Sequence, residues 1–238
     1  MKPLLIASAL LFAGSVRRPV FAAGVAASLA YLAMRGLALG RLPLIGPQDT
    51  LAFFSGSVGI MALPFVWDRR LAGVRWFVWG CGALAALFAA LALPFPTLNM
   101  PLPPFLDTYW FELHVALAFF AYALFGIAAL LGVLFLRGGG RDALDLQYRA
   151  ALVGYSFFSL SMVCGGIWGY YAWGTYWLWT AKELWTSILW MFYSLHLHLR
   201  LKGQAWERGF AWLGIVGFAV ALFTYLGVSL LMRSSHSF

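Results

Sequence analysis

Charged residues are scarce in this chain of 238 residues: 10% are Asp, Glu, Lys or Arg, whereas 63% are hydrophobic. Soluble globular domains have about 25% charged residues, so this composition excludes an ordinary water-soluble domain. The net charge of +8 does not indicate nucleic-acid binding, because the basic residues lie between long apolar runs, as loop anchors at a membrane surface do. We therefore expect a protein embedded in a lipid bilayer, with no nucleic-acid partner.

Cysteine is almost absent as well. The two cysteines, Cys81 and Cys164, each lie inside an apolar run, and no CxxC or CxxCH spacing occurs. Such residues usually behave as small buried hydrophobes. The sequence therefore argues against a thiol oxidoreductase, a zinc protein and a c-type cytochrome.

Long apolar runs dominate the chain instead. A transmembrane helix needs about 20 apolar residues, and seven runs reach or approach that length, near 19–39, 49–67, 73–93, 113–136, 150–170, 183–199 and 209–232. Segment 3–16 is shorter, and a signal peptide is the alternative interpretation of it. We favour a retained helix, because Arg17 and Arg18 follow the segment where such a helix would have its cytoplasmic anchors. We expect an all-α polytopic membrane bundle of about eight helices, forming a single transmembrane domain over residues 1–238.

Lysine and arginine are distributed unequally between alternate loops. If all eight helices span and the N-terminus is outside, eleven of the sixteen basic residues fall on the inner side. These are Arg17, Arg18, Arg69, Arg70, Arg75, Arg137, Arg141, Arg149, Arg200, Lys202 and Arg208. The outer five are Lys2, Arg35, Arg41, Lys182 and Arg233. The positive-inside rule therefore predicts that both termini lie outside.

Tryptophan is concentrated around one outer loop. Six of the twelve tryptophans lie within residues 168–190, together with three tyrosines. They are Trp168, Trp173, Trp177, Trp179, Trp185 and Trp190, with Tyr170, Tyr171 and Tyr176. An interfacial aromatic belt is the alternative interpretation, but a belt is spread over all helices. A concentrated aromatic surface suits a flat apolar ligand such as a porphyrin or a quinone.

Two of the four histidines, His114 and His236, fall on the same outer face in this topology, on either side of the tryptophan loop in the sequence. An interfacial histidine is the commoner explanation for either residue alone, but the pair predicts bis-imidazole ligation of one haem iron. His196 and His198 are separated by about 200° around one helix, so they cannot both ligate the same ion. His198 lies near the inner end, either as a functional group or as an interfacial side chain.

These residues resemble the CcsA (ResC) proteins of system II cytochrome c maturation, within the group of haem-handling membrane proteins that carry a tryptophan-rich WWD loop. The resemblance extends from about residue 35 to the C-terminus. It is most specific in residues 173–179, WGTYWLW, followed by Lys182, Glu183 and Trp185. Supporting stretches are 101–105, YWFELHV at 109–115, LHLR at 197–200, 222–228 and the end at 236–238.

The resemblance implies roles for individual residues. In that family, two outer histidines ligate haem at the WWD site, which maps onto His114 and His236. A third histidine, mapping onto His198, belongs to an inner haem site whose opposing ligand comes from a CcsB (ResB) partner. The resemblance also implies that haem b is contacted by the loop 168–185. The loop residues concerned are Trp173, Tyr176, Trp177, Trp179 and Trp185.

The same resemblance implies that haem passes to the outer face of a bacterial-type inner membrane and is delivered there to the CXXCH thiols of apocytochrome c. The protein would orient haem and control the redox state of its iron, since the bond-forming chemistry belongs largely to haem and thiol. The protein would be a holocytochrome c synthase-type enzyme if it accelerates the attachment of haem to the thiols, and a chaperone if it only delivers haem.

Two departures from the family pattern leave alternatives open. Thr180 and Ala181 stand where the family usually has Asp-Pro, and Arg41 stands where many members have histidine in Gly-His-x-Pro. Arg41 is a candidate partner for a haem propionate. The missing acid favours a regulatory or assembly-scaffold protein without haem ligation. A third alternative is a b-type electron carrier that oxidises quinol. Such a carrier needs pairs of histidines within helices at the same depth in the membrane, and only His198 could be one member of such a pair.

Overall fold

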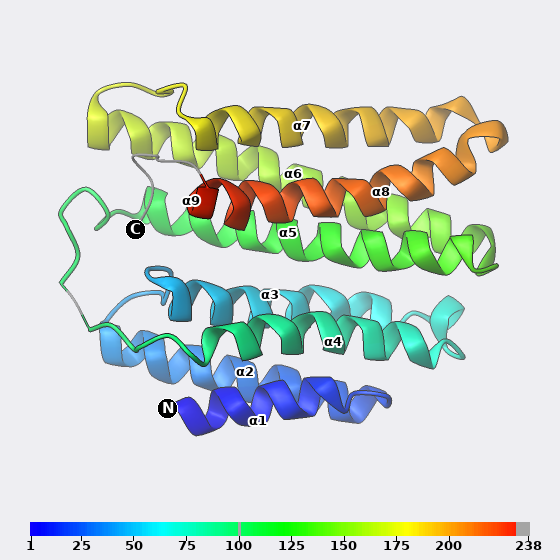
Figure 1. Ribbon diagram of the computed structural model, residues 1–238, viewed down its shortest axis with the longest axis horizontal. Helices are drawn as coiled ribbons and strands as arrows, with labels where there is room; N and C mark the ends of the chain where they lie inside the picture. The colour runs from blue at the N-terminus through cyan, green and yellow to red at the C-terminus, as the bar shows by residue number, and fades with distance from the viewer. Residues whose placement is uncertain (100, 232–238) are drawn as a thin grey trace. The chain divides into compact units, whose positions relative to one another are not determined.

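The computed structural model describes residues 1–99 and 101–231, and these residues form helices joined by short connections (Figure 1). The main helices are α1 (Lys2–Ala13), α2 (Arg18–Leu39), α3 (Pro47–Val66), α4 (Arg75–Ala92), α5 (Tyr109–Leu136), α6 (Gly140–Trp173), α7 (Ala181–Leu199) and α8 (Glu207–Leu222). The short elements are η1 (Arg69–Leu71), η2 (Arg200–Lys202), η3 (Gln204–Trp206), the π-helical turn η4 (Phe223–Gly227) and α9 (Val228–Leu231). No strand occurs in these two ranges, and the predicted all-α class is confirmed.

Six helices are long and apolar enough to cross a membrane. They are α2, α3, α4, α5, α6 and the continuous stretch Gln204–Gly227 that contains α8. The other two predicted segments are also helices: α1 is apolar but has 12 residues, and α7 has 19 residues, including Lys182 and Glu183. The chain is therefore a polytopic membrane protein built as a helical bundle.

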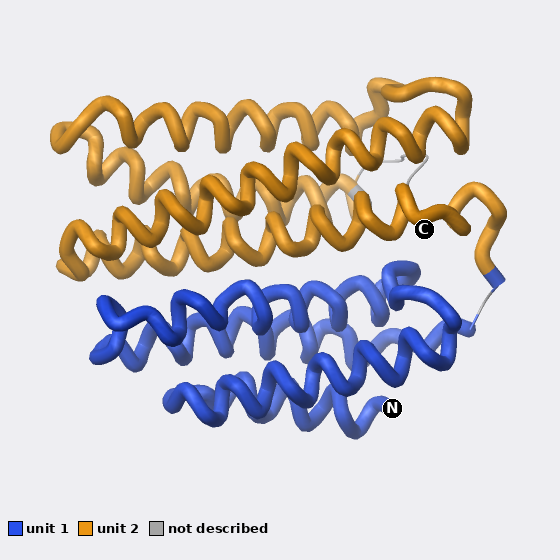
Figure 2. Tube along the Cα trace, turned by 180° about the vertical axis from the view of Figure 1, so that it is seen from behind, with its two compact units in different colours: residues 1–101 blue, residues 102–238 orange. Residues whose placement is uncertain are grey.

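The helices form two compact units, residues 1–101 and residues 102–238 (Figure 2). In unit 1, α1 and α3 each pack against both α2 and α4. Close packing there depends on small residues, as is common between membrane helices. The buried ring of Phe12 lies so close to Gly24 and Gly59 that a Cβ on either glycine would stand 2.8 Å from a ring atom. The single domain over residues 1–238 stays a prediction.

Unit 2 repeats this plan with the remaining helices: α5 packs along α6 and α8, and α7 packs against the same two helices. Phe125 of α5 stacks on Tyr193 of α7, with ring centroids 3.5 Å apart, in the centre of the unit. Consecutive helices run antiparallel (Figure 1). One end of unit 2 therefore gathers the start of α5, the end of α6, the connection 174–180 and the start of α7.

Candidate functional site

His114 lies in the second turn of α5 and is held by α6. Its Nδ1 is 2.8 Å from the carbonyl oxygen of Ser161, and the Ser161 hydroxyl donates to the carbonyl of His114 at 2.7 Å. A carbonyl oxygen only accepts hydrogen bonds, so Nδ1 must carry the proton in this contact. In the neutral ring, Nε2 then keeps its lone pair, which is the arrangement expected of a metal-ligating histidine.

Three residues of α6 surround this imidazole, at the spacing i, i+4, i+7 that places them on one helix face. They are Ser161, Gly165 and Trp168. A Cβ at Gly165 would lie 2.6 Å from His114 Nδ1, so the ring occupies the space that a side chain would fill. The buried Trp168 ring is nearly parallel to the imidazole, at 19°, with centroids 6.1 Å apart. We call these three residues the α6 cradle.

Trp168 also fixes the connection that precedes α5. Its indole Nε1 donates to the carbonyl oxygen of Phe105 at 2.6 Å, and its ring contacts Phe111 and Trp173. The helix itself begins at a Thr108 cap, whose hydroxyl accepts from the Phe111 backbone N–H. The connection before α5, which contains Pro101, Pro103 and Pro104, is thus attached to the same tryptophan that packs against His114.

The connection 174–180 ends in a capping box. Thr180 is the N-cap of α7, its hydroxyl accepts from the Glu183 backbone N–H, and the Glu183 carboxylate accepts from Thr180 N–H at 2.9 Å. The same carboxylate accepts from the Leu178 N–H at 3.0 Å. Threonine and aspartate are both good N-cap residues. Thr180 therefore supplies the capping function that an aspartate at this position would supply.

The aromatic side chains of the loop do not form one continuous flat surface. Trp177 and Trp179 meet edge to face at 82°, and Tyr176 stacks on Tyr170 at 15°. Trp179 has φ 57°, a left-handed conformation that few residues other than glycine adopt. Its side chain is 68% exposed and that of Tyr176 is 61% exposed. The loop thus presents aromatic rings outward instead of burying them.

Trp185 belongs to a different contact. It follows the loop on α7, and its ring meets Phe223 of η4 at 62°, with centroids 4.6 Å apart. Within η4, Tyr225 packs against Phe119 of α5. These two contacts join the start of α7 and the start of α5 to η4, which follows α8, at the same end of unit 2 as His114.

The remaining predicted site residues lie elsewhere. His198 is exposed near the other end of α7, and its Nδ1 is 2.7 Å from the Ser194 carbonyl oxygen, which again leaves Nε2 with its lone pair. Arg41 is partly buried in unit 1, just after α2. His236 lies outside the described residues. His114 is thus brought together with Trp168, which in turn contacts Trp173, and the pairing of His114 with His236 stays a prediction.

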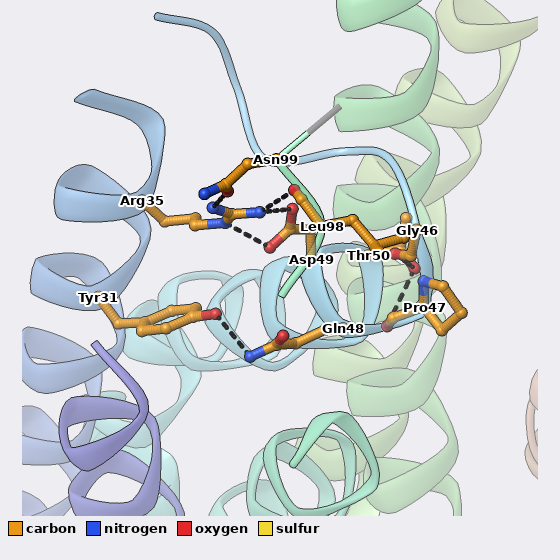
Figure 3. Close-up of polar contacts among 9 residues, drawn as sticks. All are labelled: Tyr31, Arg35, Gly46, Pro47, Gln48, Asp49, Thr50, Leu98 and Asn99. Carbon is orange, nitrogen blue, oxygen red and sulfur yellow. Dashed lines mark hydrogen bonds and ion pairs between the residues drawn. The ribbon is translucent and has the colours of Figure 1, made fainter. Parts of the chain in front are cut away.

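Unit 1 contains a polar cluster that the sequence did not reveal as one (Figure 3). Arg35 is 1% exposed and forms a two-pronged ion pair with Asp49, through contacts of 2.9 and 3.0 Å. It also donates to the Asn99 side chain and to the Leu98 carbonyl oxygen, each at 2.5 Å. The cluster therefore ties α2, the start of α3 and the connection after α4 together.

Sequence reasoning also missed Ser161 and Gly165. Their spacing relative to Trp168 is a helical face pattern, but many residues of α6 share that spacing. No feature of the sequence shows which face meets α5. The capping box was overlooked as well, although Thr180 and Glu183 have the S/T-x-x-E spacing directly before an apolar helix, which is a sequence signal for it.

Comparison of the sequence with a family profile and with individual proteins indicates the same family each time. The profile of the family described as "Cytochrome C assembly protein" matches residues 22–236. The chain is 31% identical over 217 residues to the "Cytochrome c biogenesis protein CcsA" of Chlamydomonas reinhardtii, covering 84% of this chain and 61% of the relative. A protein of the same name from Synechococcus sp. (strain CC9902) is 28% identical over 251 residues, covering 88% and 82%.

A third protein of that name, from Prochlorococcus marinus (strain MIT 9215), is 33% identical over 193 residues, which cover 65% of this chain and 62% of the relative. This chain therefore spans about three fifths of the length of two of these three relatives. The similarity includes the end of unit 2 that carries His114 and the tryptophan loop, since the family match runs through both.

Proposed function

This chain belongs to the family of cytochrome c assembly proteins, and from that premise we propose that it binds haem b beside His114 and presents it for attachment to apocytochrome c. The observation that carries the proposal is the hydrogen bond from His114 Nδ1–H to the Ser161 carbonyl. It fixes the tautomer and leaves Nε2 for iron, and histidine ligands of metals commonly have this second contact. His114 therefore fits an axial haem ligand.

We propose His236 as the second axial ligand, on the strength of the family resemblance. The exposed rings of Tyr176 and Trp179 and the adjoining Trp177 suit the apolar face of a porphyrin. Trp173 and Trp185 support the loop from its two ends. Arg41 is proposed as the partner of a propionate, because a guanidinium binds carboxylates through paired hydrogen bonds.

The chain's own share of the reaction is binding and orientation. His114 holds the iron through a ring whose rotation is restricted by the α6 cradle, while the loop restricts the position of the macrocycle. Bond formation between vinyl groups and CXXCH thiols is chemistry that haem and the client supply. A holocytochrome c synthase activity would require that this positioning accelerates the reaction, and a chaperone role would require only delivery.

We propose the inner membrane of a bacterial-type cell as the location, with the tryptophan loop facing outward. The support is the eleven-to-five distribution of lysine and arginine. His198 is proposed as a ligand of an inner haem whose opposite ligand comes from a CcsB (ResB)-type partner. Its exposed position and unshared Nε2 are compatible with contact to another chain.

The alternative function is an assembly scaffold that does not ligate haem. Its main support was the missing acid at position 180. That support is weak, because Thr180 performs the capping role of such a residue and the Glu183 carboxylate still orders the loop. The hydrogen-bonded tautomer of His114 favours haem ligation over a purely structural role.

Haem presentation and a scaffold role can be distinguished by replacing each proposed histidine ligand and then supplying imidazole in solution. We expect His114→Gly and His236→Gly to lose the low-spin spectrum of the purified, reduced protein and to lower the yield of cytochrome c. Added imidazole should restore both, since iron bonding requires the ring and not its tether. Gly166→Ala, whose added Cβ would meet only the Tyr176 carbonyl oxygen, at 3.5 Å, is the control. Wild-type spectra and yields in both glycine variants would overturn the proposal.

A further inference from the structure

A second group of buried polar side chains lies inside unit 2, toward the end opposite to the tryptophan loop. It consists of Gln147 of α6 and of Tyr193 and His196 of α7, none of which has any exposed surface. This group is separate from the α6 cradle, since Gln147 lies four turns of α6 before Ser161 at about 3.6 residues per turn. Nothing proposed above gives these residues a role.

Two of these side chains converge on one point of α8. A Cβ at Gly214 would lie 2.1 Å from Gln147 Nε2 and 3.3 Å from His196 Cε1, so the amide and the imidazole meet at this glycine. Gln147 Nε2 donates to the Ala211 carbonyl oxygen at 3.3 Å. Three helices thus contribute polar atoms to one small region, and the missing side chain of Gly214 provides the space.

Four polar atoms in this region have no hydrogen-bond partner within residues 1–99 and 101–231. They are Gln147 Oε1, the Tyr193 hydroxyl oxygen and both ring nitrogens of His196. An unpaired buried polar group is costly, and the interior of a membrane bundle offers no bulk water to compensate. Four such atoms in one region require a guest that both donates and accepts hydrogen bonds.

The surroundings restrict the chemical class of that guest. Phe210 stacks on the His196 ring, with centroids 4.2 Å apart, and Phe125 stacks on Tyr193. The polar groups are an amide, a phenol, an imidazole and a carbonyl, and the helices are closely packed around them. A buried water typically makes about three hydrogen bonds to groups of this kind. A larger ligand would also need apolar contacts with the protein, but the aromatic rings here are already in contact with each other.

We propose that Gln147, His196 and the Ala211 carbonyl form a buried water-binding site that links α6, α7 and α8. A water there donates to Gln147 Oε1 and to the unprotonated ring nitrogen of His196. A second water accepts from the protonated nitrogen, because the two ring nitrogens point in different directions and cannot share one molecule. Because His198 follows His196 by two residues on α7, this site also fixes the helix end that carries the proposed inner ligand. The water site itself does not depend on the proposed haem function.

Radiolytic hydroxyl labelling of the full chain in detergent tests the site directly. Brief X-ray exposure generates radicals from bound water, so buried residues beside a water are modified although bulk solvent does not reach them. Tyr193 and Phe210 should be modified several-fold faster than Phe54 and Phe88, which are equally buried in a stacked apolar pair of unit 1. Equal modification of all four residues in the wild-type protein would overturn the proposal.

A double-mutant cycle gives a second, independent measurement. Gln147→Met and His196→Phe should each lower the melting temperature, because each leaves the water and the other side chain short of a partner. The double variant should lose less than the two single losses combined, since it removes the polar site as a whole. Additive losses, or a higher melting temperature for His196→Phe alone, would show that the residues share no water. Haem content, measured in parallel, reports on the proposed function separately.

Discussion

At the scale of single residues, the position of the His114 ring depends both on the contacts that α6 makes with it and on the side chain that Gly165 lacks. The Ser161 carbonyl oxygen accepts a hydrogen bond from Nδ1–H, while Gly165 leaves the space that the ring occupies. Trp168 then packs alongside it. An imidazole held from three positions of one helix has an orientation that does not depend on the tryptophan loop.

The glycine of the cradle gives the sharpest residue-scale prediction. In Gly165→Ala, the new methyl group would stand 2.6 Å from His114 Nδ1, so the ring must turn and its bond to Ser161 must break. Loss of such a supporting contact typically lowers metal affinity by about 10–100-fold. We expect a fall of that size in haem titrations of the purified protein, with a weaker low-spin spectrum.

Gly166→Ala is the matched control, because its Cβ would have only the Tyr176 carbonyl oxygen nearby, at 3.5 Å. It should bind haem as the wild-type protein does. If Gly165→Ala also binds haem normally, the imidazole does not occupy the space described and the cradle has no role in ligation.

The cap at the start of α7 gives a second residue-scale prediction. Thr180→Ala removes the acceptor for the Glu183 N–H and should cost about 1 kcal/mol, whereas Thr180→Asp should be close to neutral because aspartate caps equally well. Glu183→Gln keeps an oxygen acceptor and should leave haem binding nearly intact. Thermal unfolding and haem content measure these effects. Complete loss of haem in Glu183→Gln would show that the carboxylate has a direct role.

At the scale of elements, the Arg35 cluster determines how three segments of unit 1 meet (Figure 3). The ion pair joins α2 to the first turn of α3, and the two remaining bonds of Arg35 hold the connection that follows α4. Asp49→Asn leaves a buried guanidinium without a counter-charge, so we expect a loss of about 3–5 kcal/mol in the free energy of unfolding.

The control is the double variant Arg35→Met with Asp49→Leu, which removes both charges. Replacing a buried ion pair by apolar groups is often close to neutral, so it should lose less than Asp49→Asn alone. Faster proteolysis at residues 94–99 in Asp49→Asn would show that the connection has loosened. A double variant that is less stable than the single one would mean that the pair contributes net stability.

At the scale of the whole molecule, the proposed orientation in the membrane rests on the distribution of charge alone. A cysteine in Thr175→Cys should react with an impermeant maleimide in intact cells, because the proposed topology places the tryptophan loop outside. A cysteine in Gln204→Cys, on the connection between α7 and α8, should react only after lysis. The native Cys81 and Cys164 are buried and set the background. The reverse pattern would invert the topology.

Much of the architecture was predictable because long apolar runs leave few structural choices. Backbone groups in lipid must be satisfied within each segment, so runs such as 19–39 and 113–136 had to be helices. Their observed bounds, Arg18–Leu39 and Tyr109–Leu136, differ by a few residues at the ends. Those differences arise where caps such as Thr108 start a helix before its apolar run begins.

The candidate site was predictable only in part. His114 and the tryptophan loop stood out by residue type, whereas the capping box of Thr180 and Glu183 was overlooked despite its recognisable spacing. The separation of the tryptophans into a His114 contact, a pair within the loop and a contact with η4 was not predictable, because it depends on which helix faces meet. Arg35 was interpreted as an outer basic residue, since its partner Asp49 lies 14 residues away in another helix.

The sequence by itself determined the fold class, the positions of the helices and the chemistry available at each end, because hydropathy and residue type act locally along the chain. Only the tertiary structure decided that Nδ1–H of His114 donates a hydrogen bond to the Ser161 carbonyl oxygen, that Arg35 is buried with Asp49, and that Gln147 and His196 meet at Gly214. These contacts join residues 14 to 67 positions apart. They depend on the rotation of each helix about its axis, which small packing residues fix and apolar composition leaves open.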